Sequence, residues 1–179
     1  MRKVIHKLFW AWEFDKEEAW INEMAAEGMA LVVVGWCRYE FEPCAQGEYT
    51  VRIQLLEKVP NDAQSADYLA FLEETGAEHV GTWMRWVYLR RKTADGPFEL
   101  FSDNASRIRH LGLVLTFLGI IGGLNLYIGG YNMIMWAAHG LGLNLLGIVN
   151  LLLGILSFVG FARLKKKQNK LKNEQSLFE

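Results

Sequence analysis

The chain has 179 residues, of which 51% are hydrophobic, and its formal net charge is −1. Residues 1–107 contain 12 Lys and Arg against 18 Asp and Glu, whereas residues 108–179 contain 7 against 2. An acidic N-terminal region does not suit phosphate binding, so we expect no nucleic-acid partner. The two cysteines, Cys37 and Cys44, and the four scattered histidines lack metal-ligand spacing, so we expect no metal site and no cofactor.

The N-terminal region alternates strand-like and helix-like patterns and is predicted to be an α+β domain. The predicted elements, in chain order, are a strand at 4–14, a helix at 16–27, strands at 30–42 and 48–56, a helix from 61 or 62 to 76, and a strand at 77–92. The order βαββαβ is that of a ferredoxin-like sandwich, in which two helices cover one face of a single sheet. A turn at Trp83 and Met84 would instead give five strands, and the pattern does not decide between the two.

Two apolar runs in the C-terminal region, residues 111–130 and 141–162, are predicted to form a transmembrane helical hairpin. Each run has the length of about 20 residues that a bilayer requires, and neither contains a charged side chain. The polar exceptions are Asn125, Asn144 and Asn150, which we expect to bond between helices. Residues 131–140 form the predicted connector.

The positions of Lys and Arg predict the orientation of this hairpin. Arg107 and Arg109 precede the first run and six basic residues follow the second between 163 and 172, whereas the connector has none. Because Lys and Arg are retained in the cytoplasm, we expect a multi-pass protein of the cell membrane with both termini inside. The basic tail also suits attraction to anionic lipid.

These boundaries divide the chain into a cytoplasmic domain (1–97), a juxtamembrane linker helix beginning at Ser102 or Asp103 (98–110), the hairpin (111–162) and a basic cytoplasmic tail (163–179). Glycines recur along both apolar runs and let two helices approach closely, either within one hairpin or in a homo-oligomer. These predicted helix-packing residues are Gly112, Gly119, Gly123, Gly130, Gly140, Gly147 and Gly154.

Several motifs resemble a bacterial membrane-anchored family classed as a domain of unknown function. They are Phe9-Trp10-x-Trp12-x-Phe14, the helix end Met24-Ala-x-Glu-Gly28, the strand Val-Gly-x-Trp83 and the linker Leu100-Phe101-Ser102-Asp103-Asn104. The resemblance implies a protein of the bacterial inner membrane, often encoded beside PadR-like repressors and therefore under regulated expression. It implies no catalytic residues. Met29 and Ala77 depart from the family, which usually has aromatic residues there.

Arginines interleaved with aromatic residues are expected on the uncovered face of the predicted sheet. Such a face can stack a planar ligand or anchor a protein partner, and it can equally rest against the linker or a second copy. The candidate binding residues are Phe9, Trp36, Arg38, Arg52, Trp86 and Tyr88.

The sequence contains no catalytic signature, and the helix carboxylates, including Glu17 and Glu18, are interpreted as solvated. We therefore expect a regulatory or sensory interaction module, tethered to the membrane and without catalytic activity, that binds a cytoplasmic protein or a small ligand. The alternative is a small transport or efflux accessory protein that oligomerises in the membrane.

Overall fold

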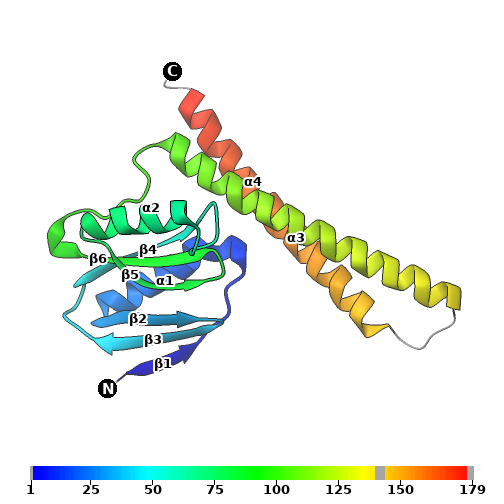
Figure 1. Cartoon of the computed structure of the whole chain (residues 1–179), viewed down its shortest axis with the longest axis horizontal. Coiled ribbons are helices and arrows are strands. Elements are labelled where there is room, and N and C mark those ends of the chain that lie inside the picture. The colour runs from blue at the N-terminus through cyan, green and yellow to red at the C-terminus, as the bar shows by residue number, and fades with distance from the viewer. Residues whose placement is uncertain (1, 140–143, 177–179) are drawn as a thin grey trace. The chain divides into compact units, whose positions relative to one another are not determined.

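A computed structural model describes residues 2–139 and 144–176. The chain forms two compact units, Met1–Ser102 and Asp103–Glu179, which are described separately below. The first is a mixed α+β unit and the second is a pair of long helices (Figure 1).

The N-terminal unit contains the same order of elements, βαββ, twice in succession. The first copy consists of β1 (Lys3–His6), a 3-10 turn η1 (Ala11–Glu13), α1 (Phe14–Ala26), β2 (Met29–Gly35) and β3 (Arg38–Pro43). The second consists of β4 (Tyr49–Leu55), α2 (Ala63–Glu74), β5 (Glu78–Trp83) and β6 (Trp86–Lys92), followed by η2 (Thr93–Asp95). Each copy makes one antiparallel three-stranded sheet, in the orders β1-β3-β2 and β4-β6-β5.

The structure confirms the predicted α+β class. It does not show the predicted ferredoxin-like topology, which has a single sheet. The segment 30–42, predicted as one strand, folds back as a hairpin. The segment 77–92 does so too, with the turn at Met84 that the alternative prediction allowed, so the described residues form six strands in two sheets. The turns contain Cys37 (φ 53°) and Met84 (φ 55°). Positive φ is uncommon outside glycine, so neither turn has the usual sequence signal. The predicted first strand ends at His6 instead of Phe14, which begins α1.

The helix α1 lies between the two sheets, and α2 covers the outer face of the sheet β4-β6-β5 (Figure 1). The strand β6 lies between the two helices and is buried on both faces. Its Trp86 packs against Phe14 of α1, with ring centroids 5.4 Å apart. The alternate residues Val87 and Leu89 join Leu69 and other residues in a cluster beneath α2.

The two sheets meet where the edge strands β2 and β5 run side by side. A Cβ on Gly81 of β5 would lie 2.8 Å from a methyl of Val34 in β2. Arg90, which is paired with Glu78 at the start of β5, donates to the carbonyl of Leu31 at 2.9 Å. Both contacts fit strands that run in the same direction. The turns of the two hairpins therefore lie at the same end of the unit.

The C-terminal unit consists of α3 (Asn104–His139, 36 residues) and α4 (Leu145–Ser176, 32 residues), which pack along each other. At 1.5 Å per residue they are about 54 and 48 Å long. Asp103 caps α3 by accepting the Ser106 N–H at 2.7 Å. Residues 131–139, predicted as part of the connector, continue α3 instead.

Candidate functional site

A buried carboxylate at the centre of the N-terminal unit joins its two sheets. Glu17 of α1 is only 8% exposed. Its Oε1 accepts the hydroxyl of Tyr39 in β3 at 2.7 Å and the hydroxyl of Tyr88 in β6 at 2.5 Å. One oxygen thus holds both sheets onto the helix between them.

The environment shifts the pKa of all three side chains upward. Burial raises the pKa of Glu17 above its ordinary value, and the two tyrosine donors only partly oppose this. Burial, followed by the Glu17 charge, raises the pKa of Tyr39 and Tyr88. The tyrosines therefore stay protonated and act as donors.

A second polar group on α1 covers the open edge of β4. Asn22 accepts the N–H of Val51 at 2.8 Å and donates to its carbonyl at 3.0 Å. Glu18, one helical turn earlier, accepts the N–H of Ile53 at 2.8 Å. Side chains here take the place of a neighbouring strand, which protects the edge from pairing with another chain.

Arg52 connects this edge to the C-terminal segment of the unit. It forms an ion pair with Glu18 at 3.1 Å and donates from Nε to the carbonyl of Phe98 at 2.8 Å. Burial raises the pKa of Glu18, opposed by the Ile53 N–H and the Arg52 charge. Glu17 and Glu18, interpreted from the sequence as solvated, are both packed into the fold.

The six candidate residues of the predicted open face do not form one surface, because they lie on different faces: Trp86 and Tyr88 face α1, whereas Arg52 is paired with Leu89 on the α2 side of the second sheet. Trp86 and Tyr88 are buried beneath α1, and Arg52 is bound as described above. Phe9 packs on Trp20 with ring centroids 5.6 Å apart, and Lys7 lies 4.4 Å from the Trp20 ring.

The other two candidates lie at or beside the β2–β3 turn. Trp36 is 72% exposed. Arg38 forms an ion pair with Glu40 at 2.7 Å.

Among the residues that the structure describes, no three His, Cys, Asp or Glu side chains are placed to hold a metal ion. The carboxylates of Glu17 and Glu18 bond to side chains and backbone of the same unit, an arrangement that suits a rigid scaffold.

Close approach of α3 and α4 depends on four glycines. A Cβ on Gly129 of α3 would lie 2.8 Å from the backbone nitrogen of Leu151, and one on Gly122 would lie 3.1 Å from Ser157. On α4, Gly147 and Gly154 face α3 in the same way. At Gly129 and Gly154 the close atoms include backbone, which leaves no room for a side chain, whereas at Gly122 and Gly147 they are side chains.

The other predicted glycines have looser surroundings. A Cβ on Gly112 or Gly119 would make ordinary contacts of 3.5 and 3.7 Å with α4, whereas one on Gly123 or Gly130 would meet nothing within 4 Å. The glycines of α3 that closely approach α4 are therefore Gly122 and Gly129, each one position before the predicted Gly123 and Gly130. Gly140 lies outside the described residues.

Polar side chains join the two helices near both ends. Asn144 donates to the carbonyl of Asn132 at 3.1 Å, and Gln168 donates to the carbonyl of Ile108 at 3.1 Å. Asn125 and Asn150 instead bond to carbonyls of their own helices. One of the three asparagines predicted to bond between helices therefore does so.

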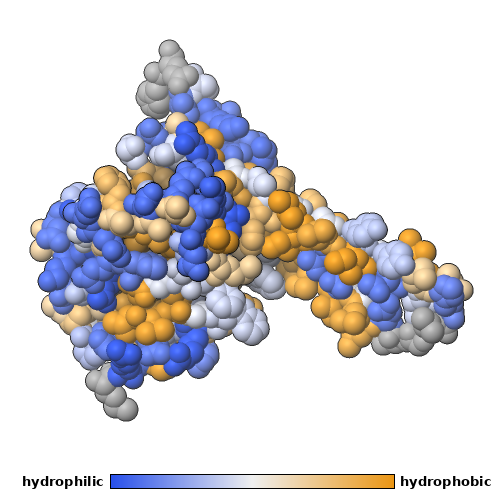
Figure 2. Space-filling view, in the orientation of Figure 1, coloured by the Kyte–Doolittle hydropathy of each residue, from blue (hydrophilic) through white to orange (hydrophobic). Residues whose placement is uncertain are grey.

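Large apolar side chains point outward from this glycine-lined contact (Figure 2). Both helices are long and apolar enough to cross a membrane. The exposed residues include Ile120, Leu124, Tyr127, Ile134, Leu146, Leu152, Ile155 and Val159.

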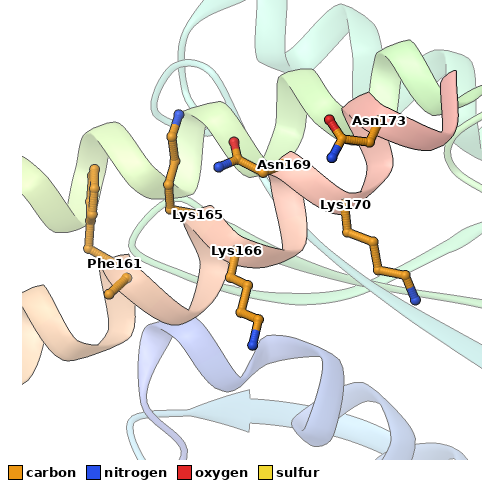
Figure 3. Close-up of a pocket in the computed structure, with 7 residues that line it drawn as sticks. Phe161, Lys165, Lys166, Asn169, Lys170 and Asn173 are labelled. Carbon is orange, nitrogen blue, oxygen red and sulfur yellow. The ribbon is translucent and has the colours of Figure 1, made fainter. Parts of the chain in front are cut away.

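The character of α4 changes towards its C-terminus. One face carries lysines and asparagines around a shallow hollow (Figure 3). An open groove of about 520 Å³ between α3 and α4 also has Lys165 and Lys172 in its lining. The residues that line the hollow on α4 are Phe161, Ala162, Lys165, Lys166, Asn169, Lys170 and Asn173.

One family model, described as a protein of unknown function (DUF2812), matches residues 13–122. The match covers both helices of the N-terminal unit, five of its six strands and the first half of α3. Comparison with curated proteins found no match, and neither did comparison with solved structures. Since the family model matches more than half of the chain, this protein belongs to the DUF2812 family.

Proposed function

We propose that this protein is a regulatory or sensory module tethered to the cell membrane, whose N-terminal unit binds a cytoplasmic protein or a small ligand without catalysing a reaction. The C-terminal unit carries the proposal. Four of its glycines face the helix contact, its large apolar side chains face outward and its lysines gather towards the end of α4. This arrangement suits a two-helix hairpin in lipid, because lipid solvates the apolar exterior and inward glycines permit close packing.

The proposed orientation has both termini in the cytoplasm. Arg107 and Arg109 near the start of α3, and the basic residues from 163 to 172 on α4, belong to the same end of the antiparallel pair. Lys and Arg near membrane spans are retained on the cytoplasmic side. The bonds of Asn125 and Asn150 within their own helices give no support to a polar pore.

Membrane extraction and cysteine labelling test the tether and its orientation. In a C37S/C44S background, we expect a membrane-impermeant maleimide to label H139C in intact cells and S102C only after lysis. The protein should remain with membranes in alkaline carbonate. Release by carbonate contradicts the tether, and labelling of S102C in intact cells contradicts the orientation.

A matched pair of glycine variants tests the closed hairpin. G129V places methyl groups against the backbone of α4, whereas G130V places them in open space. We expect G129V to abolish a disulfide formed between added cysteines on α3 and α4, and G130V to retain it. Equal crosslinking in both variants contradicts the proposed packing.

Crosslinking and copurification from native membranes test the binding role. A specific protein recovered with the intact chain, and lost from a control containing residues 103–179 alone, supports the proposal. Repeated recovery of no specific partner, together with no response of the intact chain to panels of small ligands, contradicts it.

A further inference from the structure

We propose that one end of the N-terminal unit docks on the lipid surface and inserts four apolar side chains into the bilayer interface. These residues, called the tip below, are Leu8, Trp36, Trp83 and Met84. The inference rests on the proposed membrane tether and adds a second, peripheral contact with lipid.

The fold brings the tip residues to one end of the unit. Since β2 and β5 run in the same direction, the β2–β3 turn and the β5–β6 turn lie at the same end. Trp36 belongs to the first turn, and Trp83 and Met84 to the second. The N–H of Lys7 donates to the carbonyl of Cys37 at 3.1 Å, which places Leu8 beside the first turn.

The tip is unusually exposed for such apolar side chains. Trp36 is 72% exposed, Met84 62%, Leu8 58% and Trp83 40%. The same unit buries Trp12 and Trp86, so its interior does accommodate tryptophan. A group of exposed large apolar side chains at one end of a domain marks an interaction surface.

The chemistry of the tip favours a bilayer interface as the occupant. Tryptophan has an apolar ring with one polar N–H and is enriched at the level of lipid headgroups. Lys7 and Arg85 lie next to tip residues in sequence, where cations suit an anionic lipid surface.

The path of the chain supports the same occupant. After β6, the N–H of Thr93 donates to the carbonyl of Glu48 at the end of β4 remote from the tip. Phe98 is then bound by Arg52, which is further along β4 towards the tip. By Phe98 the chain has therefore returned from the remote end to the level of the middle of β4. Residues 103–110, about 12 Å of helix, separate the unit from the predicted span at Leu111.

Fluorescence quenching in reconstituted full-length protein tests the proposal. Cys37 lies in the first turn, so it is labelled with an environment-sensitive NBD group in a C44S background. The vesicles contain phosphatidylcholine, phosphatidylglycerol and a lipid spin-labelled in its acyl chain. We expect a blue shift and strong quenching at Cys37. The additional substitutions W36S and M84S should remove both, with the thermal unfolding midpoint unchanged because both side chains are exposed.

Two further labelled positions make the outcomes distinguishable. F71C, on the exposed side of α2, should show no quenching in a C37S/C44S background. L124C, on the outward side of α3, should be quenched wherever the hairpin lies in lipid. Quenching at L124C but not at Cys37 overturns the tip proposal and leaves the tether standing. Loss of quenching at both positions overturns both proposals.

Other results at Cys37 also overturn the docking proposal. A blue shift without lipid quenching means that a protein or a second copy covers the tip. Equal quenching at Cys37 and F71C means that the unit adsorbs to lipid without a specific surface. Quenching that survives W36S and M84S means that these side chains do not mediate the contact.

Discussion

The helices α1 and α2 occupy equivalent places in the two βαββ copies but have different surroundings. Each is followed by a glycine with positive φ, Gly28 at 85° and Gly76 at 88°. The first lies between two sheets and uses Glu17, Glu18 and Asn22 to bond to them, whereas the second covers one sheet with an apolar face. Local sequence thus determines that a helix forms, and the elements that fold over it determine which polar side chains it needs.

The largest expected difference between the helices concerns their apolar contacts. Ile21 of α1 is fully buried, and I21A should reduce the free energy of unfolding by about 2–5 kcal/mol, because it leaves a cavity between two sheets. L69A on α2, at a site 9% exposed, should cost less. Urea unfolding of the full chain in detergent, followed by tryptophan fluorescence, measures both. Equal losses would show that the two helices are equally important to the core.

A smaller effect is expected where α1 bonds to the edge of β4. N22A removes both bonds to Val51 and should cost about 1–3 kcal/mol in the same assay, since a partly buried backbone donor and acceptor lose their partners. Q64A, on the exposed side of α2, is the control and should change stability by less than about 0.5 kcal/mol. An unchanged N22A midpoint would mean that water replaces the amide at no cost.

The start of α2 provides a contrast in helix capping. Asp62 accepts the N–H of Gln64 at 3.0 Å, whereas α1 has no side-chain cap. D62A should therefore destabilise the unit by about 1 kcal/mol, and D62N, which retains a cap, by a few tenths. The measurement is again urea unfolding. Equal losses for the two variants would indicate that charge, not capping, is responsible.

The smallest expected effect is the pH dependence conferred by Glu17. Its pKa is raised on folding, so the folded state holds its proton more tightly, and this contribution to stability is lost as pH rises above the ordinary value of 4.5. E17Q should flatten that fall in unfolding free energy with pH. E73Q, on the exposed side of α2, should retain the wild-type slope. Parallel curves for E17Q and wild type would contradict the shift.

The sequence predicted those parts of the fold that local signals determine. Helix 16–27 corresponds to α1 at Phe14–Ala26, the Asp62 cap begins α2, and strand 48–56 corresponds to β4 at Tyr49–Leu55. The turn at Cys37 was not predicted and the turn at Trp83 and Met84 was left undecided, because both turns use residues that rarely adopt positive φ. Neither turn, Trp36-Cys37 or Met84-Arg85, contains a glycine or proline, so each segment resembles one long strand.

The central polar group was missed for a different reason. Tyr39 and Tyr88 are 22 and 71 residues away from Glu17, so no short motif connects them. One signal was present: Glu17 lies at helical spacing on the stripe of Phe14, Ile21 and Met24, all buried. A carboxylate within an apolar stripe indicates a buried partner, and this reading would have predicted that Glu17 is not solvated.

The register of α3 against α4 determines how deep the proposed hairpin lies in a bilayer. Phe161 is opposite Gly119 and Gln168 is opposite Gly112, so the cations from Arg163 to Lys167 lie alongside uncharged residues of α3. The inner edge of the hydrocarbon is then set by Arg163, about 12 Å deeper than Arg109 alone would place it. Trp136 has the kind of amphipathic ring that is enriched at membrane interfaces, and from the Arg163 level to it is about 29 Å of helix, the thickness of an ordinary hydrocarbon core. The pair is therefore expected to be shifted outward relative to the span 111–130, with Leu111 among the lipid headgroups and long basic side chains extending to reach them.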